Sequence, residues 1–375
     1  MSTTETSPSD PDAAPGAPRA GRLLLIDGHS MAFRAYYALP VDSFTTSTGQ
    51  ATNAVHGFIS MLLSLLEQER PTHLAVAFDL PGGTFRTREY PDYKATRDET
   101  PQPLIGQIEL IKDILAAMGV RAVTAPDYEA DDVLATLASR AQAEGLEVLV
   151  CSGDRDSFQL ITENCTVLQP VRGGSAPRRM TPAQVQERYG VSPERYPHLA
   201  ALVGETSDNL RGVPGVGPKT AAKWLNLYDG LDGVIAHAGQ IRGRAGASLR
   251  EHLDDVVRNR RLNRLVTDVD LGIDPLRDLR PGGAGREELA RIMEALELRT
   301  LHRRAQRVLT FRDAAGSGDG SGDPVRERLA ALEIAVLGRQ VEPGGVGAWL
   351  DRHAGGGPLG LDVVGVLAPE RGDAQ

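Results

Sequence analysis

The chain has 375 residues, of which 41% are hydrophobic and 24% charged, so it can form two or more globular domains with cores of their own. Its formal net charge of −9 argues against a uniformly basic nucleic-acid binder, and no apolar run approaches the roughly 18 residues of a membrane span. Cys151 and Cys165 lack zinc-site spacing, and the N-terminus lacks the pattern of a secretory leader, so a cytoplasmic protein is expected.

The first 180 residues alternate between short apolar runs and helically spaced apolar sets. Residues 1–21 have almost nothing to bury and are expected to be disordered. The predicted elements are strands at 23–26, 74–78, 120–124 and 146–151, helices at about 31–38, 53–68 and 103–118, and a helix that follows 128–132 and ends near 143. Such alternation predicts an α/β fold, a mainly parallel sheet with helices on both faces.

An aspartate lies just past the C-terminal end of each of three apolar strands. These residues are Asp27, Asp79 and Asp154. Ligands of open parallel sheets bind at the carboxyl edge of the strands, where all three residues are expected to lie. Asp is also common in turns for structural reasons, but its recurrence at three strand ends favours a shared site.

The segment 128–132 adds three acids, Glu129, Asp131 and Asp132, immediately before an apolar helix. The helix dipole alone favours acids there, which is the structural alternative. Grouped carboxylates repel one another, however, and divalent cations remove that cost. Hard oxygen ligands without nearby His or Cys indicate Mg²⁺ or Mn²⁺. Two such ions about 4 Å apart can hold an attacking water and a leaving oxygen on one phosphodiester.

From about residue 181 the pattern becomes helical. Thr181 and Pro182 are expected to open one helix, as its N-cap and first position, and residues 194–203 to form another. A glycine hairpin follows, with Gly212, Gly215, Gly217 and Lys219 ahead of another helix. Glycines expose backbone N–H groups and suit close approach to a phosphate backbone, although glycine turns between helices are also common. Seven arginines in 242–264 are either a second backbone contact or a solvated face.

Residues 312–327 read as a flexible Gly/Ser/Asp linker, and patterning returns at about 328. The remaining residues to 375 are too few for an independent domain of ordinary size.

Several short motifs occur in order along the chain. They are Leu-Ile-Asp27-Gly, Phe-Arg34-Ala, Ala-Phe-Asp79, Thr-Phe-Arg86, Tyr93-Lys94-x-x-Arg97, Glu129-Ala-Asp131-Asp132, Gly-Asp154-x-Asp156, Ser-Asp208-Asn and Gly-Val-Pro-Gly-Val-Gly. Over about Arg22–Phe311 the chain resembles the 5′-nuclease domain of bacterial DNA polymerase I, actinobacterial type, which is related to flap endonucleases. The resemblance implies a PIN-like nuclease core at 22–180 with an arch at about 84–104. It also implies a helical DNA-binding subdomain at 181–311 with a helix-hairpin-helix-type motif.

The resemblance also implies roles for individual residues. Asp27, Asp79, Glu129, Asp131 and Asp154 would serve one metal ion or the water between two ions, and Asp132, Asp156, Glu205 and Asp208 mainly the other. Arg34, Arg86, Lys94 and Arg97 would grip the scissile phosphate, Tyr93 would stack on a terminal base, and Gly212, Gly215, Gly217 and Lys219 would contact DNA. A monovalent cation at the glycine hairpin is a further expectation. The family usually has Asp in place of Glu205, so that contact is either direct or through water.

The implied activity is metal-dependent hydrolysis at 5′ ends and 5′ flaps, on DNA with a flap, nick or gap, by a monomer. A non-catalytic DNA-junction binder is the alternative. An aspartyl phosphatase would need Asp-x-Asp after the first strand, where this chain has Asp27-Gly28-His29. Residues 328–375 resemble the opening of a degenerate proofreading domain, in which Asp362 stands alone without its Asp-x-Glu partner, so no second nuclease is expected.

Overall fold

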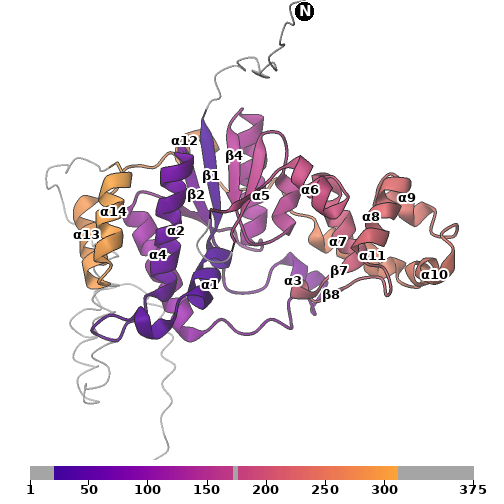
Figure 1. Ribbon diagram of the computed structural model, residues 1–375, viewed down its shortest axis with the longest axis horizontal. Coiled ribbons are helices and arrows are strands. Elements are labelled where there is room, and N and C mark those ends of the chain that lie inside the picture. Colours follow the sequence, from indigo (N-terminus) through magenta and orange to yellow (C-terminus); the bar gives the residue numbers. More distant parts are fainter. Residues whose placement is uncertain (1–20, 172–175, 311–375) are drawn as a thin grey trace, which may run out of the picture. The chain divides into compact units, whose positions relative to one another are not determined.

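The computed structural model describes residues 21–171 and 176–310, which belong to one compact unit (Figure 1). Residues 1–20 of the tail expected at 1–21, the linker at 312–327 and the proofreading-like segment at 328–375 with Asp362 lie outside the described residues. No helix within the described ranges has both the length and the apolar surface to cross a bilayer.

A six-stranded sheet in the order β3-β2-β1-β4-β5-β6 forms the centre of this unit. Its strands are β1 (Arg22–Asp27), β2 (His73–Ala77), β3 (Arg121–Val123), β4 (Glu147–Cys151), β5 (Cys165–Gln169) and β6 (Arg178–Met180). All neighbours pair in parallel except β5 and β6, which are antiparallel. The mainly parallel α/β fold is confirmed. Strands β5 and β6, at one side of the sheet, were not predicted, because their short, partly polar sequences lack the apolar run of the other strands.

The register of the sheet brings the strand ends together. Ile26 pairs with Val76 on one side and with Cys151 on the other, so β1, β2 and β4 end at the same level. The residues that follow these strands, including the predicted acids, therefore lie at one edge.

Helices cover both faces of the sheet, because strand residues alternate in direction. Leu23 and Leu25 share a buried cluster with Val133 and Leu137 of α5 (Ala130–Ala143). Leu24, also buried, points to the opposite face, where α1 (Gly28–Ala38), α2 (Asn53–Glu69) and α4 (Gln102–Ala117) pack against one another. Between β2 and α4 lies the short helix α3 (Phe85–Glu89).

From residue 182 to residue 310 the described chain is mainly helical, apart from a hairpin of two two-residue strands. Its elements are α6 (Pro182–Tyr189), α7 (Tyr196–Val203), β7 (Gly204–Glu205), β8 (Leu210–Arg211), α8 (Pro218–Leu227), α9 (Leu231–Ala236), α10 (Gly243–Glu251), α11 (Leu253–Asn263), α12 (Pro275–Asp278), α13 (Arg286–Ala295) and α14 (Arg299–Val308). Single 3-10 turns are η1 (Val41–Ser43), η2 (Asp156–Leu160), η3 (Pro193–Arg195) and η4 (Thr206–Asp208). Helices α7, α8 and α11 pack together around the hairpin.

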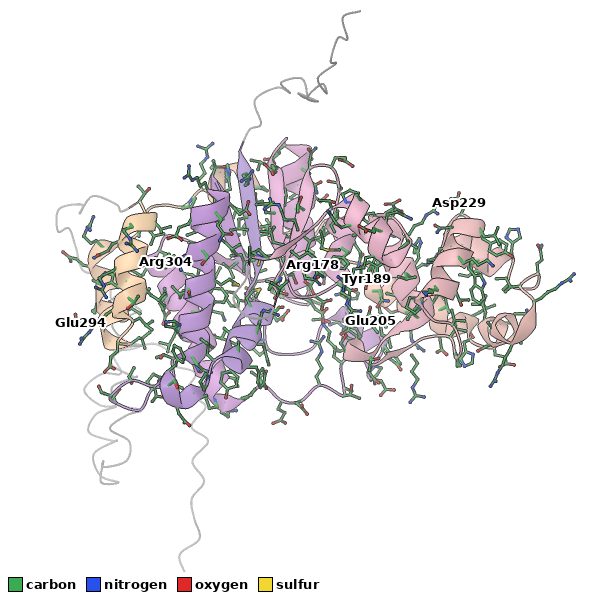
Figure 2. All side chains as sticks on the ribbon, in the orientation of Figure 1. Arg178, Tyr189, Glu205, Asp229, Glu294 and Arg304 are labelled. Atoms are coloured by element: carbon green, nitrogen blue, oxygen red, sulfur yellow. The ribbon has the colours of Figure 1, made fainter. Side chains whose placement is uncertain are left out.

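The last two helices return to the sheet half of the molecule. Helix α13 packs on α4 and α14 on α2, where Arg304 forms a 2.5 Å ion pair with Glu67 (Figure 2). Leu289 and Leu301 bury the apolar stripes of these helices. The structure thus differs from the expectation of one helical subdomain over 181–311, because α13 and α14 belong with the core.

Candidate active site

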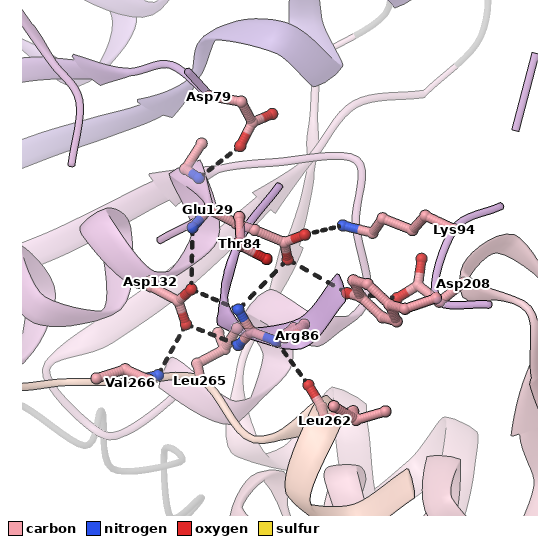
Figure 3. Close-up of polar contacts among 12 residues, drawn as sticks. Asp79, Thr84, Arg86, Lys94, Glu129, Asp132, Asp208, Leu262, Leu265 and Val266 are labelled. Carbon is pink, nitrogen blue, oxygen red and sulfur yellow. Dashed lines mark hydrogen bonds and ion pairs between the residues drawn. The ribbon is translucent and has the colours of Figure 1, made fainter. Parts of the chain in front are cut away.

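The three strand-end acids lie at the carboxyl edge of the sheet, as expected. Asp27 caps α1 and accepts hydrogen bonds from Ser30 N at 3.0 Å and from Ser152 Oγ at 2.9 Å. Asp79, after β2, accepts a 2.7 Å hydrogen bond from Ala130 N at the start of α5. Asp79 thereby joins the end of the strand to the acidic helix (Figure 3).

The acidic helix start holds Glu129 at its N-cap and Asp131 in its first turn. Glu129 Oε1 accepts a 2.8 Å hydrogen bond from Lys94 Nζ. One oxygen of Asp131, Oδ1, is buried and has no hydrogen-bond partner among the described residues. A buried carboxylate oxygen without a donor is unfavourable unless a cation or a proton compensates it.

A second group of acids comes from the turn after β4 and from the β7–η4 segment. Asp156 begins η2, and its buried Oδ1 likewise lacks a partner within the described part of the chain. Asp154 and Glu205 line a cleft of about 690 Å³. Asp208 in η4 is buried beside them. Segments up to about 180 residues apart in the sequence thus meet at one place.

The electrostatics show how close these acids are. Burial raises the pKa of Asp27 to about 6. Burial and the negative charges of Asp27 and Asp154 hold the pKa of Asp131 well above its ordinary value. Burial and Asp154 likewise raise the pKa of Asp156, and burial together with Asp154 brings that of Glu205 to about 7. The acids form one interacting cluster whose charged state requires a compensating cation.

The donor set fits hard divalent cations, since it contains carboxylates with two unpartnered oxygens. Among the residues that the structure describes, however, no group of three or more His, Cys, Asp or Glu side chains is already arranged to hold an ion. Several of the carboxylates instead accept hydrogen bonds from the protein. Ion binding therefore requires some of these contacts to open.

Two cations from the predicted arch segment make such contacts. Arg97 Nη2 lies 2.7 Å from Asp208 Oδ1, and Lys94 pairs with Glu129. Burial disfavours the Lys94 ammonium, but Glu129 and Asp208 more than offset this and raise its pKa. Lys94 also has a φ of 58°, in the left-handed region that side chains rarely adopt, and its N–H donates to the Asp208 carbonyl. The strained backbone holds this lysine against the acids.

The structure gives Arg86 and Asp132 a different place from the predicted phosphate grip and metal ligand. Both side chains are buried, and the Arg86 guanidinium binds both oxygens of Asp132, at 2.5 and 2.8 Å. Asp132 also accepts from the N–H groups of Glu129 and Val266. In this arrangement Asp132 has no free oxygen for an ion, and Arg86 cannot reach a phosphate.

Tyr93 also differs from the expectation of a base-stacking residue. Only 4% of it is exposed, and its hydroxyl oxygen lies 3.2 Å from Glu129 Oε2 and 3.3 Å from Asp208 Oδ2, so that its one proton can be donated to either carboxylate. Burial and the two acids raise the pKa of its hydroxyl, which therefore stays a proton donor. Tyr93 therefore contacts the acids through its hydroxyl and has no exposed ring face on which a base could stack.

Arg34 lies on α1, half-buried at the wall of the cleft, which also contains Ser30 and Arg155. Ser152 also belongs to the site, although it was not predicted from the sequence. Its hydroxyl donates to Asp27 and accepts a 3.1 Å hydrogen bond from Asp154 N. Its position between a buried strand and Asp154 was a usable signal, because a small hydroxyl there can bind two neighbouring strand ends.

The glycine hairpin lies between β8 and α8. Gly212 packs so tightly that an added Cβ would lie 2.0 Å from the Val203 carbonyl oxygen, whereas Gly215 and Gly217 face open space. Gly217 caps α8, whose first turn carries the exposed Lys219. An exposed N-terminus with a lysine and no side chains over the backbone is suited to a phosphate. Within 242–264, Arg260 and Arg261 pair with Asp232 and Glu89, which leaves that segment less basic than its composition indicates.

The raised carboxylate pKa values predict an unusual pH dependence of stability. Protons bind the folded state more tightly, so in EDTA the thermal midpoint is expected to fall by a few degrees as pH rises through about 6 and about 7, the pKa values of Asp27 and Glu205. Saturating Mg²⁺ should weaken this trend, because it favours the charged carboxylates. Differential scanning calorimetry from pH 5 to 8 measures the slope of thermal midpoint against pH in EDTA and in Mg²⁺. Equal slopes under the two conditions would contradict Mg²⁺ binding by these carboxylates.

Comparison with known proteins agrees with this geometry. Residues 22–190 match the family described as 5′-3′ exonuclease, N-terminal resolvase-like domain, and residues 191–287 match 5′-3′ exonuclease, C-terminal SAM fold. The 5′-3′ exonuclease of Aquifex aeolicus is 36% identical over 293 residues, which cover 78% of this chain and 97% of that protein. DNA polymerase I of Mycobacterium tuberculosis is 45% identical over all 375 residues, and the chain spans 39% of that polymerase's length.

Solved structures share the fold at lower identity. The zinc-bound 5′-exonuclease of bacteriophage T5 has a TM-score of 0.54 at 20% identity, covering 76% of this chain and 98% of that one. The catalytic core of Rad2 in complex with DNA substrate has a TM-score of 0.50 at 17% identity, covering 77% and 91%. The mainly parallel sheet and the adjoining helices thus have the fold that these structures share. The chain belongs to the 5′-3′ exonuclease family, which confirms the resemblance found in its motifs.

Proposed function

We propose that this chain is a metal-dependent nuclease that hydrolyses phosphodiesters at 5′ ends and 5′ flaps of nicked or branched DNA, as in Okazaki-fragment processing and excision repair. The supporting observation is the cluster of acids from five distant segments, with buried and unpartnered oxygens on Asp131 and Asp156. The proposal includes two Mg²⁺ or Mn²⁺ ions, a monovalent cation at the glycine hairpin, a DNA flap, nick or gap as substrate, and a monomer.

Within this proposal the acids hold the ions and the arch cations act on the phosphate. Two bound divalent ions supply an activated water and neutralise the leaving oxygen. Arg34 borders the cleft, while Lys94 and Arg97 are already at the acids and need only turn toward an entering phosphate. Charged N–H donors placed in this way stabilise the negative charge that develops during hydrolysis.

Glu205 is part of the proposed second ion site. It lies in the cleft beside Asp154, and its raised pKa reflects burial and that neighbour. The extra methylene relative to Asp lengthens the reach of the carboxylate by about one bond. We propose that Glu205 contacts the second ion directly or through one water.

The decisive experiment incubates the full chain with a 5′-labelled flap duplex in Mg²⁺ and in EDTA. Cleavage near the junction in Mg²⁺, absent in EDTA and restored by added Mg²⁺, is the expected result. Binding of the flap by gel shift without cleavage under any divalent ion would instead establish a non-catalytic junction-binding module.

Lys219→Ala is expected to weaken binding of flap DNA uniformly across sequences, because Lys219 stands at the open N-terminus of α8. Losing one phosphate contact should lower the slope of log affinity against log salt by about 1. Fluorescence anisotropy at several salt concentrations measures this slope. The control is Arg121→Ala. Arg121 is an exposed arginine on β3, the outermost strand on the side of the sheet away from β6. An unchanged slope for Lys219→Ala would remove the hairpin from the DNA path.

A further inference from the structure

The ion pair of Arg86 and Asp132 is more deeply buried than the acids around it. Their side chains are 1% and 0% exposed, respectively. Breaking such a pair leaves an uncompensated charge inside the protein, so a pair like this persists only with further hydrogen bonds. Those hydrogen bonds join α3, α5 and the end of α11 (Figure 3).

Arg86 connects the root of the predicted arch to the end of the helical part. It lies on α3, and its Nε donates to the Leu262 carbonyl at 2.8 Å while Nη2 donates to the Arg264 carbonyl at 3.1 Å. Both carbonyls are at the C-terminal end of α11, where backbone acceptors lack helical partners and a cation is favoured.

Asp132 fixes the backbone of Glu129. The two residues form a reciprocal cap of α5, in which Asp132 Oδ2 accepts from the Glu129 N–H at 3.1 Å. Arg86 Nη1 also lies 3.5 Å from Glu129 Oε2. The backbone and the carboxylate of Glu129 are therefore both held by the buried pair, while the other oxygen of Glu129 faces Lys94.

We propose that Arg86 and Asp132 are positioning residues that orient the Glu129 carboxylate toward the acidic cluster. They also fix the positions of α3, α5 and the end of α11 relative to one another. The inference rests on the proposed function, because it gives Glu129 a metal to bind. Neither residue of the pair contacts the ion or the substrate.

The test is Mn²⁺ binding to the full chain without DNA, measured by isothermal titration calorimetry for wild type, Arg86→Met and Lys94→Ala. Removing a cation near carboxylates should by charge alone strengthen Mn²⁺ binding, and this is expected for Lys94→Ala. If Arg86 positions Glu129, Arg86→Met should instead bind Mn²⁺ about tenfold or more weakly. Equal or tighter binding by Arg86→Met would overturn the inference.

A second comparison separates positioning from simple stability. Arg86→Met and Asp132→Leu should each lower the thermal midpoint by roughly 10 °C, and the double variant should recover most of that loss. Mn²⁺ affinity should stay reduced in the double variant, since nothing then holds Glu129. Recovery of both stability and Mn²⁺ affinity would make the pair purely structural and overturn the inference.

Asp132→Asn covers the case in which apolar variants fail to fold, because Asn keeps the shape and an acceptor for Val266 N–H. Weaker Mn²⁺ binding with unchanged stoichiometry is expected, whereas loss of one bound ion would make Asp132 a ligand and overturn the inference. Wild type that binds no Mn²⁺ would overturn the proposed function itself, which keeps the two failures distinct.

Discussion

Replacing Asp131 by Asn is expected to reduce cleavage of a 5′-flap duplex by roughly a thousandfold or more while flap binding survives. The substitution removes the charge of a carboxylate whose buried Oδ1 has no hydrogen-bond partner in the described part of the chain. Metal ions contribute several kcal/mol of transition-state stabilisation, and about 4 kcal/mol corresponds to roughly a thousandfold in rate. Single-turnover cleavage in Mg²⁺ and anisotropy in Ca²⁺ measure the two properties.

The matched control is Asp254→Asn, which neutralises an exposed acid in the first turn of another helix, α11. It should cleave like wild type. Asp131→Asn should also be more stable than wild type in EDTA, because it removes a charge that burial and the neighbouring acids Asp27 and Asp154 disfavour. Undiminished turnover by Asp131→Asn would end its assignment as a metal ligand.

Lys94→Ala is expected to slow the chemical step about a hundredfold to a thousandfold with little change in KM. Lys94 is held at the acids by its strained backbone and by Glu129, and not on an open DNA-binding surface. A donor that acts only on developing charge lowers kcat and kcat/KM together. Pre-steady-state quench-flow at saturating flap substrate measures this step directly.

Lys219→Ala provides the opposite signature, a higher KM with kcat unchanged, because Lys219 lies on the exposed start of α8. The two lysine variants together separate chemistry from binding. If excess substrate restored Lys94→Ala to the wild-type rate, Lys94 would be a binding residue and its proposed catalytic role would fail.

The sheet and the acidic edge could be predicted from the sequence because each depends on local signals. Buried parallel strands require continuous apolar runs such as 23–26, and the residue after such a run must lie at the carboxyl edge. The acids Asp27, Asp79 and Asp154 follow from those two rules alone. Strands β5 and β6 have too little apolar length to carry the same signal.

The division of labour between Asp131 and Asp132 could not be predicted in this way. Both are acids in the same helical turn, and the difference lies in what each side chain meets. Asp132 turns toward Arg86, 46 residues earlier, and Val266, 134 residues later. Asp131 turns toward the strand-end acids. Neither contact has a signature in the local sequence.

Tyr93 shows the same limit. An aromatic residue beside Lys94 and Arg97 is typical of a single-strand contact. In the structure its ring is buried with Leu210 and Leu262, and its hydroxyl faces Glu129 and Asp208. Motif spacing identifies which residues gather at a site, but long-range hydrogen bonds decide which of them face solvent.

The return of α13 and α14 to the core has a practical consequence for anyone who prepares fragments of this chain. The recognised family segments end at residue 287, near the start of α13. A fragment that ends there would expose the surfaces of α2 and α4 on which α14 and α13 pack. It would also lose the ion pair between Arg304 and Glu67. The shortest soluble, well-behaved expression fragment should therefore extend through residue 310.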